Sequence, residues 1–155
     1  MLNDQEFKDV MSYQCSSVFI VSFVAGGSLK GLAVSSFQSV SVDPQFVSFS
    51  ISHKTKNRID VVRSKFFGIS LLGADQREIG ELYSTPGSNR FAADEYFIGP
   101  EGCPLIKRAV FHLVINLHQF VTVGATDIVY GQVVWGCQGV ARRPLTYWRR
   151  TFLGD

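Results

Sequence analysis

The chain has 155 residues, the length of one ordinary domain, and 46% of them are hydrophobic, including 13 Phe. We therefore expect a single domain over residues 1–155 that buries its core without disulfides or a structural metal. The formal net charge of +2 argues against a nucleic-acid binder, in which Lys and Arg gather on one face.

The first 52 residues predict one short helix and three strands. Asn3 and Glu6 have the spacing of a capping box and precede apolar residues at helical spacing, so we expect a helix over residues 4–13. Beyond it, segments rich in Val, Phe and Ile are separated by Gly26-Gly27 and by Asp43-Pro44, which favour turns. The strands expected here are residues 17–25, 29–37 and 46–52.

The rest of the chain predicts two further helices, a long loop and three strands. Thr55 can cap one helix, and Asp75 with Glu78 forms a second capping box that opens a helix ending at Tyr83. Residues 84–104 contain several Gly and Pro and predict a long loop, which in a compact domain is usually functional. The strands expected here are residues 66–72, 110–123 and 128–137.

Strands dominate this pattern, and the helices are short. We therefore predict a mainly β protein, an antiparallel barrel with a few short peripheral helices. Charged residues make up 18% of the chain, below the usual quarter, which indicates that a second subunit covers part of the surface. The N-terminal residues lack a signal-peptide pattern, and no apolar run approaches the ~20 residues of a membrane span, so we expect a cytoplasmic protein.

Neither the histidines nor the cysteines form a convincing catalytic or metal-binding set. His112 and His118 share one face of a strand but lie ~20 Å apart, too far to bind one metal ion, and we interpret them as surface or interface side chains. Cys15, Cys103 and Cys137 are odd in number and far apart, which favours buried free thiols in a reducing compartment over disulfides or zinc.

Two neighbouring segments carry the clearest signs of a ligand site. Gly31-Leu-Ala-Val-Ser-Ser-Phe-Gln-Ser-Val-Ser-Val-Asp-Pro44 is rich in serine, which is consistent either with hydroxyl and amide contacts to a planar ligand or with an exposed edge strand. Ser52-His-Lys-Thr-Lys-Asn-Arg58 lies where a strand ends and a helix begins. Its cations suit a phosphate, although a capped helix with solvated lysines has the same pattern. The two segments in this order favour a phosphorylated aromatic cofactor.

The same segments resemble the flavin reductase-like family. After the serine-rich segment come a strand, Ser52-His-Lys-Thr55, a helix and Phe66-Phe-Gly-Ile-Ser-Leu-Leu72. Arg90-Phe-Ala92, Val123-Gly124 through Gly131-Gln-Val133, and Pro144-Leu-Thr-Tyr147 continue the family's order over almost the whole chain. Members of this family are split-barrel FMN or FAD binders and include the small reductase components of two-component monooxygenases. The resemblance therefore implies an antiparallel split β-barrel, a homodimer and a flavin site.

The resemblance also implies which residues contact the cofactors. The residues expected along the isoalloxazine ring, the ribityl chain and the phosphate are Ala33, Val34, Ser35, Ser36, Phe37, Ser39, Ser52, Lys54, Thr55, Asn57 and Phe91. Those expected on the nicotinamide side are Thr126, Tyr147 and Trp148. The chain departs from the family pattern at Ala33, where many members have Thr, and at Thr126 and Trp148, where many have His.

We therefore predict an NAD(P)H-dependent flavin reductase that transfers hydride from NADH or NADPH to FMN or FAD and supplies reduced flavin to a partner oxygenase. No side chain needs to act as an acid or base, because the cofactor carries the chemistry. The two missing histidines leave two alternatives open: a flavin-binding protein or electron carrier without nicotinamide-dependent activity, and an interaction barrel with an empty site. We expect no metal and neither nucleic-acid nor membrane partners.

Overall fold

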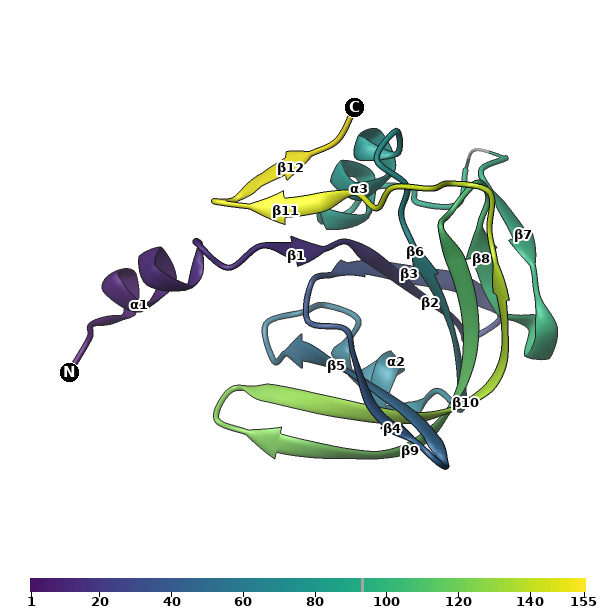
Figure 1. The fold of residues 1–155 in the computed structure, drawn as a ribbon. Coiled ribbons are helices and arrows are strands. Elements are labelled where there is room, and N and C mark those ends of the chain that lie inside the picture. The colour runs from purple at the N-terminus through teal and green to yellow at the C-terminus, as the bar shows by residue number, and fades with distance from the viewer. Residues whose placement is uncertain (93) are drawn as a thin grey trace.

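The computed structural model describes residues 1–92 and 94–155. Its largest element is an antiparallel sheet whose strands are β2 (Phe19–Ala25), β3 (Ser28–Val34), β4 (Gln38–Val42), β5 (Gln45–Ser52), β6 (Phe66–Leu71), β9 (Phe111–Val123) and β10 (Thr126–Gln138). These seven strands lie in the order β3-β2-β6-β9-β10-β5-β4. Figure 1 shows the sheet bent around a core, with the long strands β9 and β10 joining its two halves.

Two smaller sheets and several short helices lie around this sheet. They are built from α1 (Asp4–Met11), β1 (Ser16–Ser17), α2 (Arg58–Arg63), α3 (Arg77–Ser84), β7 (Tyr96–Ile98), the 3₁₀ turn Pro100–Gly102, β8 (Pro104–Ile106), β11 (Thr146–Trp148) and β12 (Thr151–Leu153). β11 pairs with β1 and β12, and β7 pairs with β8. In Figure 1, α1 projects away from the rest of the chain beside the β11–β12 hairpin.

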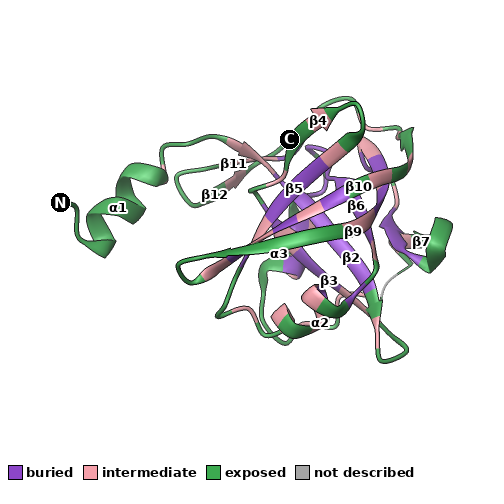
Figure 2. Ribbon diagram, turned by 90° about the horizontal axis from the view of Figure 1, so that it is seen from below, coloured by how far each residue is buried: buried purple, intermediate pink, exposed green. Residues whose placement is uncertain are grey.

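The continuous apolar run of β2 follows from burial on both of its faces. On one face, the rings of Phe23 and Phe49 pack edge-on against Phe67, with centroids 5.7 and 5.8 Å from it. On the other face, Ile20 joins a second cluster that includes Tyr83 of α3. Figure 2 shows β2 and its neighbours as the most buried part of the chain. The mainly β, antiparallel architecture predicted from the sequence is therefore present.

The predicted capping box at the start of α1 is confirmed. The Glu6 N–H donates to Asn3 Oδ1 over 2.9 Å, and the Asn3 N–H donates to Glu6 Oε2 over 2.8 Å. The helix ends at Met11, two residues before the predicted end at Tyr13. This start is predictable because both hydrogen bonds are made within four consecutive residues.

The starts predicted for the other two helices are wrong. α2 begins at Arg58, because the Thr55 N–H donates to Ser52 O over 2.9 Å and so Thr55 lies in a turn. α3 begins at Arg77 with Gln76 as its N-cap, and no side chain caps it, so Asp75 does not open a capping box. A local turn precedes α2, whereas before α3 the buried side chain of Gln76 bonds to Gly73 and to the distant Lys107.

Several strand boundaries also differ from the sequence prediction. β3 ends at Val34 rather than at residue 37. It is followed by β4, which is the exposed edge strand that the serine-rich segment had as its alternative interpretation. The predicted loop over residues 84–104 contains β7, and β8 begins at its last residue. β7 and β8 are three-residue apolar segments that pair with each other, whereas β4 alternates Ser with Val and pairs with β5.

The interpretation of His112 as a surface side chain is wrong, whereas His118 is exposed as predicted. His112 is 5% exposed, with Nδ1 3.4 Å from Ser70 Oγ, and burial lowers its pKa.

Cys15, Cys103 and Cys137 are all free, but Cys103 alone among them is buried, so the prediction of burial fails for the other two. Within the described part of the chain, no helix has both the length and the apolar character needed to span a membrane.

Candidate functional site

A groove of about 670 Å³ lies between three segments that are distant in the sequence. Residues 29–33 of β3 form one side, residues 54–57 after β5 form another, and most of residues 83–91 at and after the end of α3 complete it. This volume lies within the range of sites that bind drug-sized ligands and cofactors. Because all three segments converge there, the groove is the strongest candidate for the functional site.

Aromatic rings and a close backbone approach shape the side of the groove formed by β3 and α3. Tyr83 is 3% exposed and packs edge-on against Phe91, with ring centroids 5.5 Å apart, and Phe91 packs against Tyr96 at 5.2 Å. The backbone of Gly31 passes so close that a Cβ there would lie 2.8 Å from Tyr83 Cε1. Burial raises the pKa of the Tyr83 hydroxyl, so this group stays protonated at neutral pH.

Arg90 places a buried donor with no partner in the wall of the groove. Its Nη1 donates to Gly31 O, and its Nη2 donates to Thr85 O over 3.1 Å. Among the described residues, Nε of Arg90 is the buried side-chain nitrogen or oxygen that has no hydrogen-bond partner. Burial also lowers the pKa of this guanidinium. A buried donor without a partner is costly, so a ligand that brings an acceptor to Nε would relieve that cost.

The segment over residues 54–57 gives the groove its positive side. The groove is lined here by Lys54, Thr55, Lys56 and Asn57. The segment is a pair of turns, in which the Thr55 N–H donates to Ser52 O over 2.9 Å and the Arg58 N–H donates to Thr55 O over 3.0 Å. Ammonium groups together with neutral donors suit a phosphate or another anion.

A buried carboxylate, Asp127, lies behind this segment. It is 0% exposed, and it accepts hydrogen bonds from Arg58 Nε at 2.5 Å, Thr122 Oγ1 at 2.7 Å and His53 Nε2 at 3.0 Å. Donation from Arg58, and next from Thr122, holds the pKa of Asp127 well below its usual range. The carboxylate is therefore ionised at neutral pH, and the donors around it stabilise its charge.

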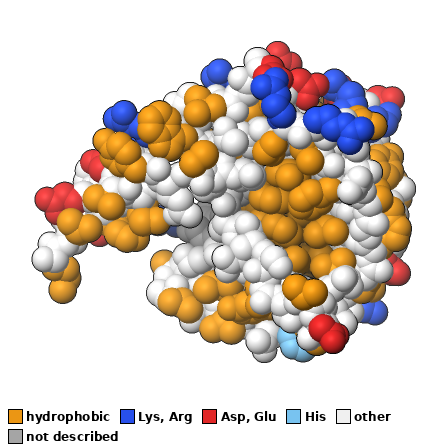
Figure 3. Space-filling view, in the orientation of Figure 1, with side chains coloured by type: hydrophobic (Ala, Val, Ile, Leu, Met, Phe, Trp, Pro, Cys, Tyr) orange, Lys and Arg blue, Asp and Glu red, His pale blue; other side chains and the backbone are white. Residues whose placement is uncertain are grey.

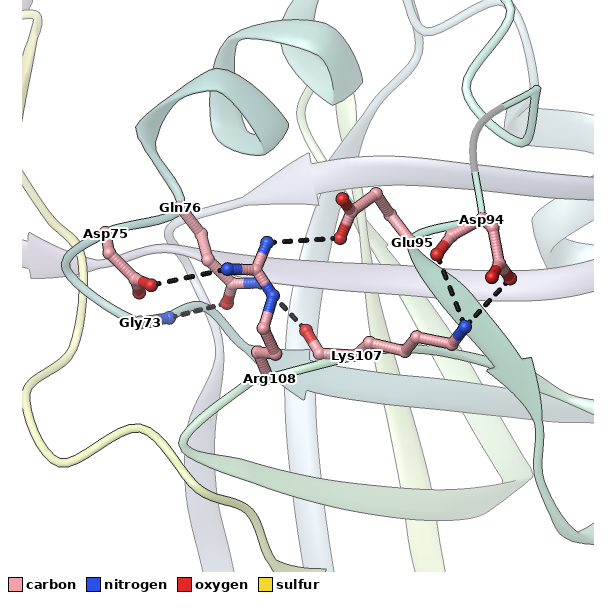
Figure 4. Close-up of polar contacts among 7 residues, drawn as sticks. All are labelled: Gly73, Asp75, Gln76, Asp94, Glu95, Lys107 and Arg108. Carbon is pink, nitrogen blue, oxygen red and sulfur yellow. Dashed lines mark hydrogen bonds and ion pairs between the residues drawn. The ribbon is translucent and has the colours of Figure 1, made fainter.

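A polar network fixes the chain that leads away from the groove wall (Figure 4). Gln76 accepts from the Gly73 N–H at 2.9 Å and donates to Lys107 O at 2.8 Å. Arg108 Nη2 lies 3.2 Å from Glu95 Oε2, and Lys107 Nζ lies 2.8 Å from an oxygen of the neighbouring Asp94. The network thus joins the start of α3, the residues just before β7 and the turn after β8.

The structure brings some of the predicted flavin residues together and separates others from the groove. Five line it: Ala33, Lys54, Thr55, Asn57 and Phe91. The remaining six lie outside its lining. Val34 is buried in the core, where Phe37 packs on Phe19 with ring centroids 4.5 Å apart, and Ser35 and Ser39 are exposed. The other two bond to the backbone: Ser36 Oγ accepts from the Ser50 N–H at 2.8 Å, and Ser52 Oγ accepts from the Lys54 N–H at 3.2 Å.

The three residues predicted on the nicotinamide side do not line the groove. Thr126 pairs with Ser52 in the β10–β5 register, just before the segment over residues 54–57. Tyr147 packs against Phe152, with ring centroids 5.1 Å apart. Trp148 is 38% exposed, and its Nε1 donates to Tyr13 O over 3.1 Å. Thr126 is therefore separated from Tyr147 and Trp148, which lie in the sheet beside α1.

Sequence reasoning missed three residues of the site. Arg90 belongs to the Arg90-Phe-Ala92 segment, of which the resemblance assigns only Phe91 to the cofactor. Asp127 lies between the predicted strands 110–123 and 128–137, where a carboxylate beside an apolar strand signals a buried partner. Tyr83 is the predicted end of a helix, and nothing in its neighbours shows that its ring packs against Gly31.

Comparison with known proteins decides the family. The model of the flavin reductase like domain matches residues 11–154. The chain belongs to the flavin reductase-like family. An NADH:riboflavin 5'-phosphate oxidoreductase of Streptomyces pristinaespiralis is 32% identical over 96% of this chain and 86% of its own length. The reductase subunit HsaB of a flavin-dependent monooxygenase of Rhodococcus jostii is 22% identical over 99% of this chain and 78% of its own.

Solved structures agree with this assignment. The NADH:FAD oxidoreductase SgcE6 of Streptomyces globisporus C-1027 superposes with a TM-score of 0.89 at 25% identity, covering 98% of this chain and 94% of that one. The family resemblance and the fold class predicted from the sequence are both confirmed. The superposition covers almost all of the chain, including the residues that line the groove.

The groove has the chemical features that a flavin requires. Ala33 and Phe91 give the planar ring apolar contacts, and Lys54 and Thr55 give a phosphate a cation and a hydroxyl. Arg90, whose Nε has no hydrogen-bond partner, also lines the groove. The residues present in this flavin reductase-like chain therefore fit FMN or FAD.

Proposed function

We propose that this chain is an NAD(P)H:flavin oxidoreductase that binds FMN or FAD in the groove and supplies reduced flavin to a partner monooxygenase. The single observation that carries the proposal is the groove itself, which sets a cationic segment opposite aromatic rings in a chain of the flavin reductase-like family. The names of the relatives support it, because they include NADH:flavin oxidoreductases and the reductase subunit of a monooxygenase.

In this proposal the protein binds and orients its ligands. Lys54, Thr55 and Asn57 hold the flavin phosphate, and Ala33 and Phe91 lie against the ring system. Arg90 donates from Nε to an oxygen of the same ligand and remains fixed by its bonds to Gly31 O and Thr85 O. The bound flavin supplies the redox chemistry by accepting hydride from the nicotinamide. Alignment of the two ring systems and exclusion of water are then the contributions of the chain.

The proposal is tested by anaerobic mixing of the protein and FMN with NADH or NADPH. Loss of the visible flavin absorbance with either nucleotide is the expected result. Persistent absorbance with both nucleotides would instead support a flavin carrier, the alternative that the missing histidines at positions 126 and 148 favour. An empty interaction barrel would bind neither FMN nor FAD in a fluorescence titration.

The phosphate assignment has its own test. Lys54→Ala combined with Thr55→Ala is expected to raise the dissociation constant of FMN by roughly tenfold or more, because it removes a charge-assisted contact and a hydroxyl. Lys65→Ala is the matched control, since Lys65 is exposed and lies outside the groove lining. Unchanged FMN affinity in the double variant would refute the assignment.

We further propose that the protein is a homodimer and that α1 packs against the second copy. None of the residues of α1 is buried, and Phe7, Val10 and Met11 are 57%, 58% and 45% exposed on one face of the helix. Figure 3 shows hydrophobic side chains along this projecting arm and over the middle of the same face of the molecule. An isolated helix of eight residues is marginal in water, so an apolar contact with a partner would stabilise it.

The dimer is tested by light scattering of the eluted protein. The wild-type chain is expected to have twice the mass of one chain, and Phe7→Ser is expected to shift it toward the monomer. Gln5→Ser, on the opposite side of α1, is the control and should leave the mass unchanged. A monomeric wild-type protein would overturn the proposal.

We also propose that the protein is cytoplasmic, because three cysteines without a disulfide suit a reducing compartment.

A further inference from the structure

The carboxylate of Asp127 connects three parts of the chain that are far apart in the sequence. Asp127 is the second residue of β10, its donor Thr122 belongs to β9, and its other donors, His53 and Arg58, come from the segment after β5. Oδ1 accepts from Thr122 and His53, and Oδ2 accepts from Arg58. A fully buried carboxylate is tolerated when its oxygens receive donors in this way.

Two of these donors enclose the positive segment of the groove. His53 immediately precedes Lys54, and Arg58 immediately follows Asn57. The His53 N–H also donates to Ala125 O over 2.9 Å, which attaches the same end of the segment to the β9–β10 turn. Both ends of residues 54–57 are thus attached to β10 or to the turn before it, and through Asp127 they share one anchor.

The ion pair with Asp127 also distinguishes Arg58 from the two lysines of the segment. Arg58 is matched by Asp127, with Nε 2.5 Å from Oδ2. For Lys54 and Lys56, by contrast, the described residues provide no ion-pair partner, and both line the groove. The lysine ammonium groups therefore remain available to a ligand, while the guanidinium is held away from it.

We propose that Asp127 is a positioning residue for the flavin phosphate, acting through His53 and Arg58 on the segment 54–57. This inference rests on the proposed function and adds a residue that does not touch the ligand. A segment fixed at both ends has fewer conformations to lose when the phosphate binds, so the contacts of Lys54 and Thr55 cost less entropy to form. Release of the ends would weaken the phosphate contacts and leave those of the ring in place.

The test compares FMN with riboflavin, which lacks only the phosphate. In Asp127→Asn, the amide keeps the shape of the carboxylate but loses its charge and one acceptor position. The dissociation constant of FMN, measured by quenching of flavin fluorescence, is expected to rise about tenfold. The dissociation constant of riboflavin is expected to change by less than about twofold, because its ring contacts do not depend on the segment.

Two further variants separate positioning from loss of structure. His53→Ala removes the side-chain bond between one end of the segment and Asp127, while the backbone bond of residue 53 to Ala125 O remains and Arg58 and Thr122 still satisfy Asp127. It is expected to lower the preference for FMN by about threefold, and it decides the question if Asp127→Asn does not fold. Thr122→Val removes a hydrogen bond to the same carboxylate from a residue outside the segment, and it is expected to keep the wild-type preference.

The outcomes distinguish this inference from the proposed function. A wild-type FMN preference that persists in both Asp127→Asn and His53→Ala would overturn the positioning role while leaving the reductase proposal intact. An equal loss of FMN and riboflavin affinity in these variants would also overturn it, since that pattern marks general damage to the groove. Equal binding of FMN and riboflavin by the wild-type protein would overturn both the phosphate assignment and the role of Asp127.

Discussion

Gly31→Ala perturbs the groove at the point where β3 passes against Tyr83. The new Cβ would lie 2.8 Å from Tyr83 Cε1 and 3.2 Å from Phe91 Cζ. Carbon atoms prefer separations of at least ~3.5 Å, so the Tyr83 ring would have to move by about 0.7 Å. Tyr83 is 3% exposed and is surrounded by other side chains, so this displacement disturbs its neighbours as well.

Two opposing effects set the size of the change in stability. Overpacking of a buried site costs about 1–3 kcal/mol, whereas replacement of Gly by Ala in a strand contributes roughly 0.5–1 kcal/mol in favour of folding. The net loss is therefore about 1 kcal/mol, which for a chain of this size lowers Tm by about 2–4 °C. Displacement of the Tyr83 and Phe91 rings also weakens their contacts with the flavin ring system, so FMN and riboflavin should lose affinity equally.

The assay is a thermal melt followed by circular dichroism, with flavin titrations on the same preparations. Ser28→Ala, at the exposed start of the same strand, is the control and should change the free energy of unfolding by no more than about 0.5 kcal/mol. A Tm for Gly31→Ala equal to or above that of the wild type would show that the strand gains from Ala without a clash. That result would refute the close approach of β3 to Tyr83.

Three further predictions concern buried polar groups. Burial holds the pKa of His112 below its ordinary value, so the unfolded chain binds a proton first as the pH falls below about 7; urea unfolding should show a loss of stability toward pH 5 that is smaller in His112→Gln. Gln76→Ala leaves two backbone groups without partners and should lower the free energy of unfolding by about 2–4 kcal/mol, whereas Asp75→Asn, an exposed ion-pair partner, should cost at most about 1 kcal/mol. Burial raises the pKa of Cys103 to about 11, so a thiol reagent at pH 8 should modify the two exposed cysteines quickly and Cys103 only after denaturant is added; rapid modification of all three thiols would contradict its burial.

The predictable parts of the fold are those fixed by neighbouring residues. The capping box of Asn3 and Glu6 closes within four residues, and it forms as predicted. Asp75 and Glu78 have the same spacing, yet Gln76 is the N-cap of α3 and its side chain accepts from Gly73 instead. The difference is burial, because Gln76 is 2% exposed and must satisfy the backbone around it.

The candidate site divides in a similar way. The cations of residues 52–58 and their place after a strand predicted a phosphate site there, and the family resemblance assigned Lys54, Thr55 and Asn57 to it. All three line the groove. Ser35 and Ser39 carry the same kind of polar signal and lie outside its lining. The face of the sheet to which a serine hydroxyl points depends on the register of the strands, which the sequence does not give. A cationic turn at the end of a strand, by contrast, is exposed because of its position.

The amino-acid sequence alone determined the mainly β architecture, the family and the cationic segment of the groove. Apolar alternation and turn residues are local, and the order of the motifs is a property of the chain. The tertiary structure decided that Arg90 and Tyr83 complete the groove and that Asp127 holds both ends of residues 54–57. These relations depend on segments about 50 to 75 residues apart, and no local pattern records which of them will meet. The cationic segment could be predicted from the sequence, whereas its contact with Asp127 forms only through the pairing of β10 with β5.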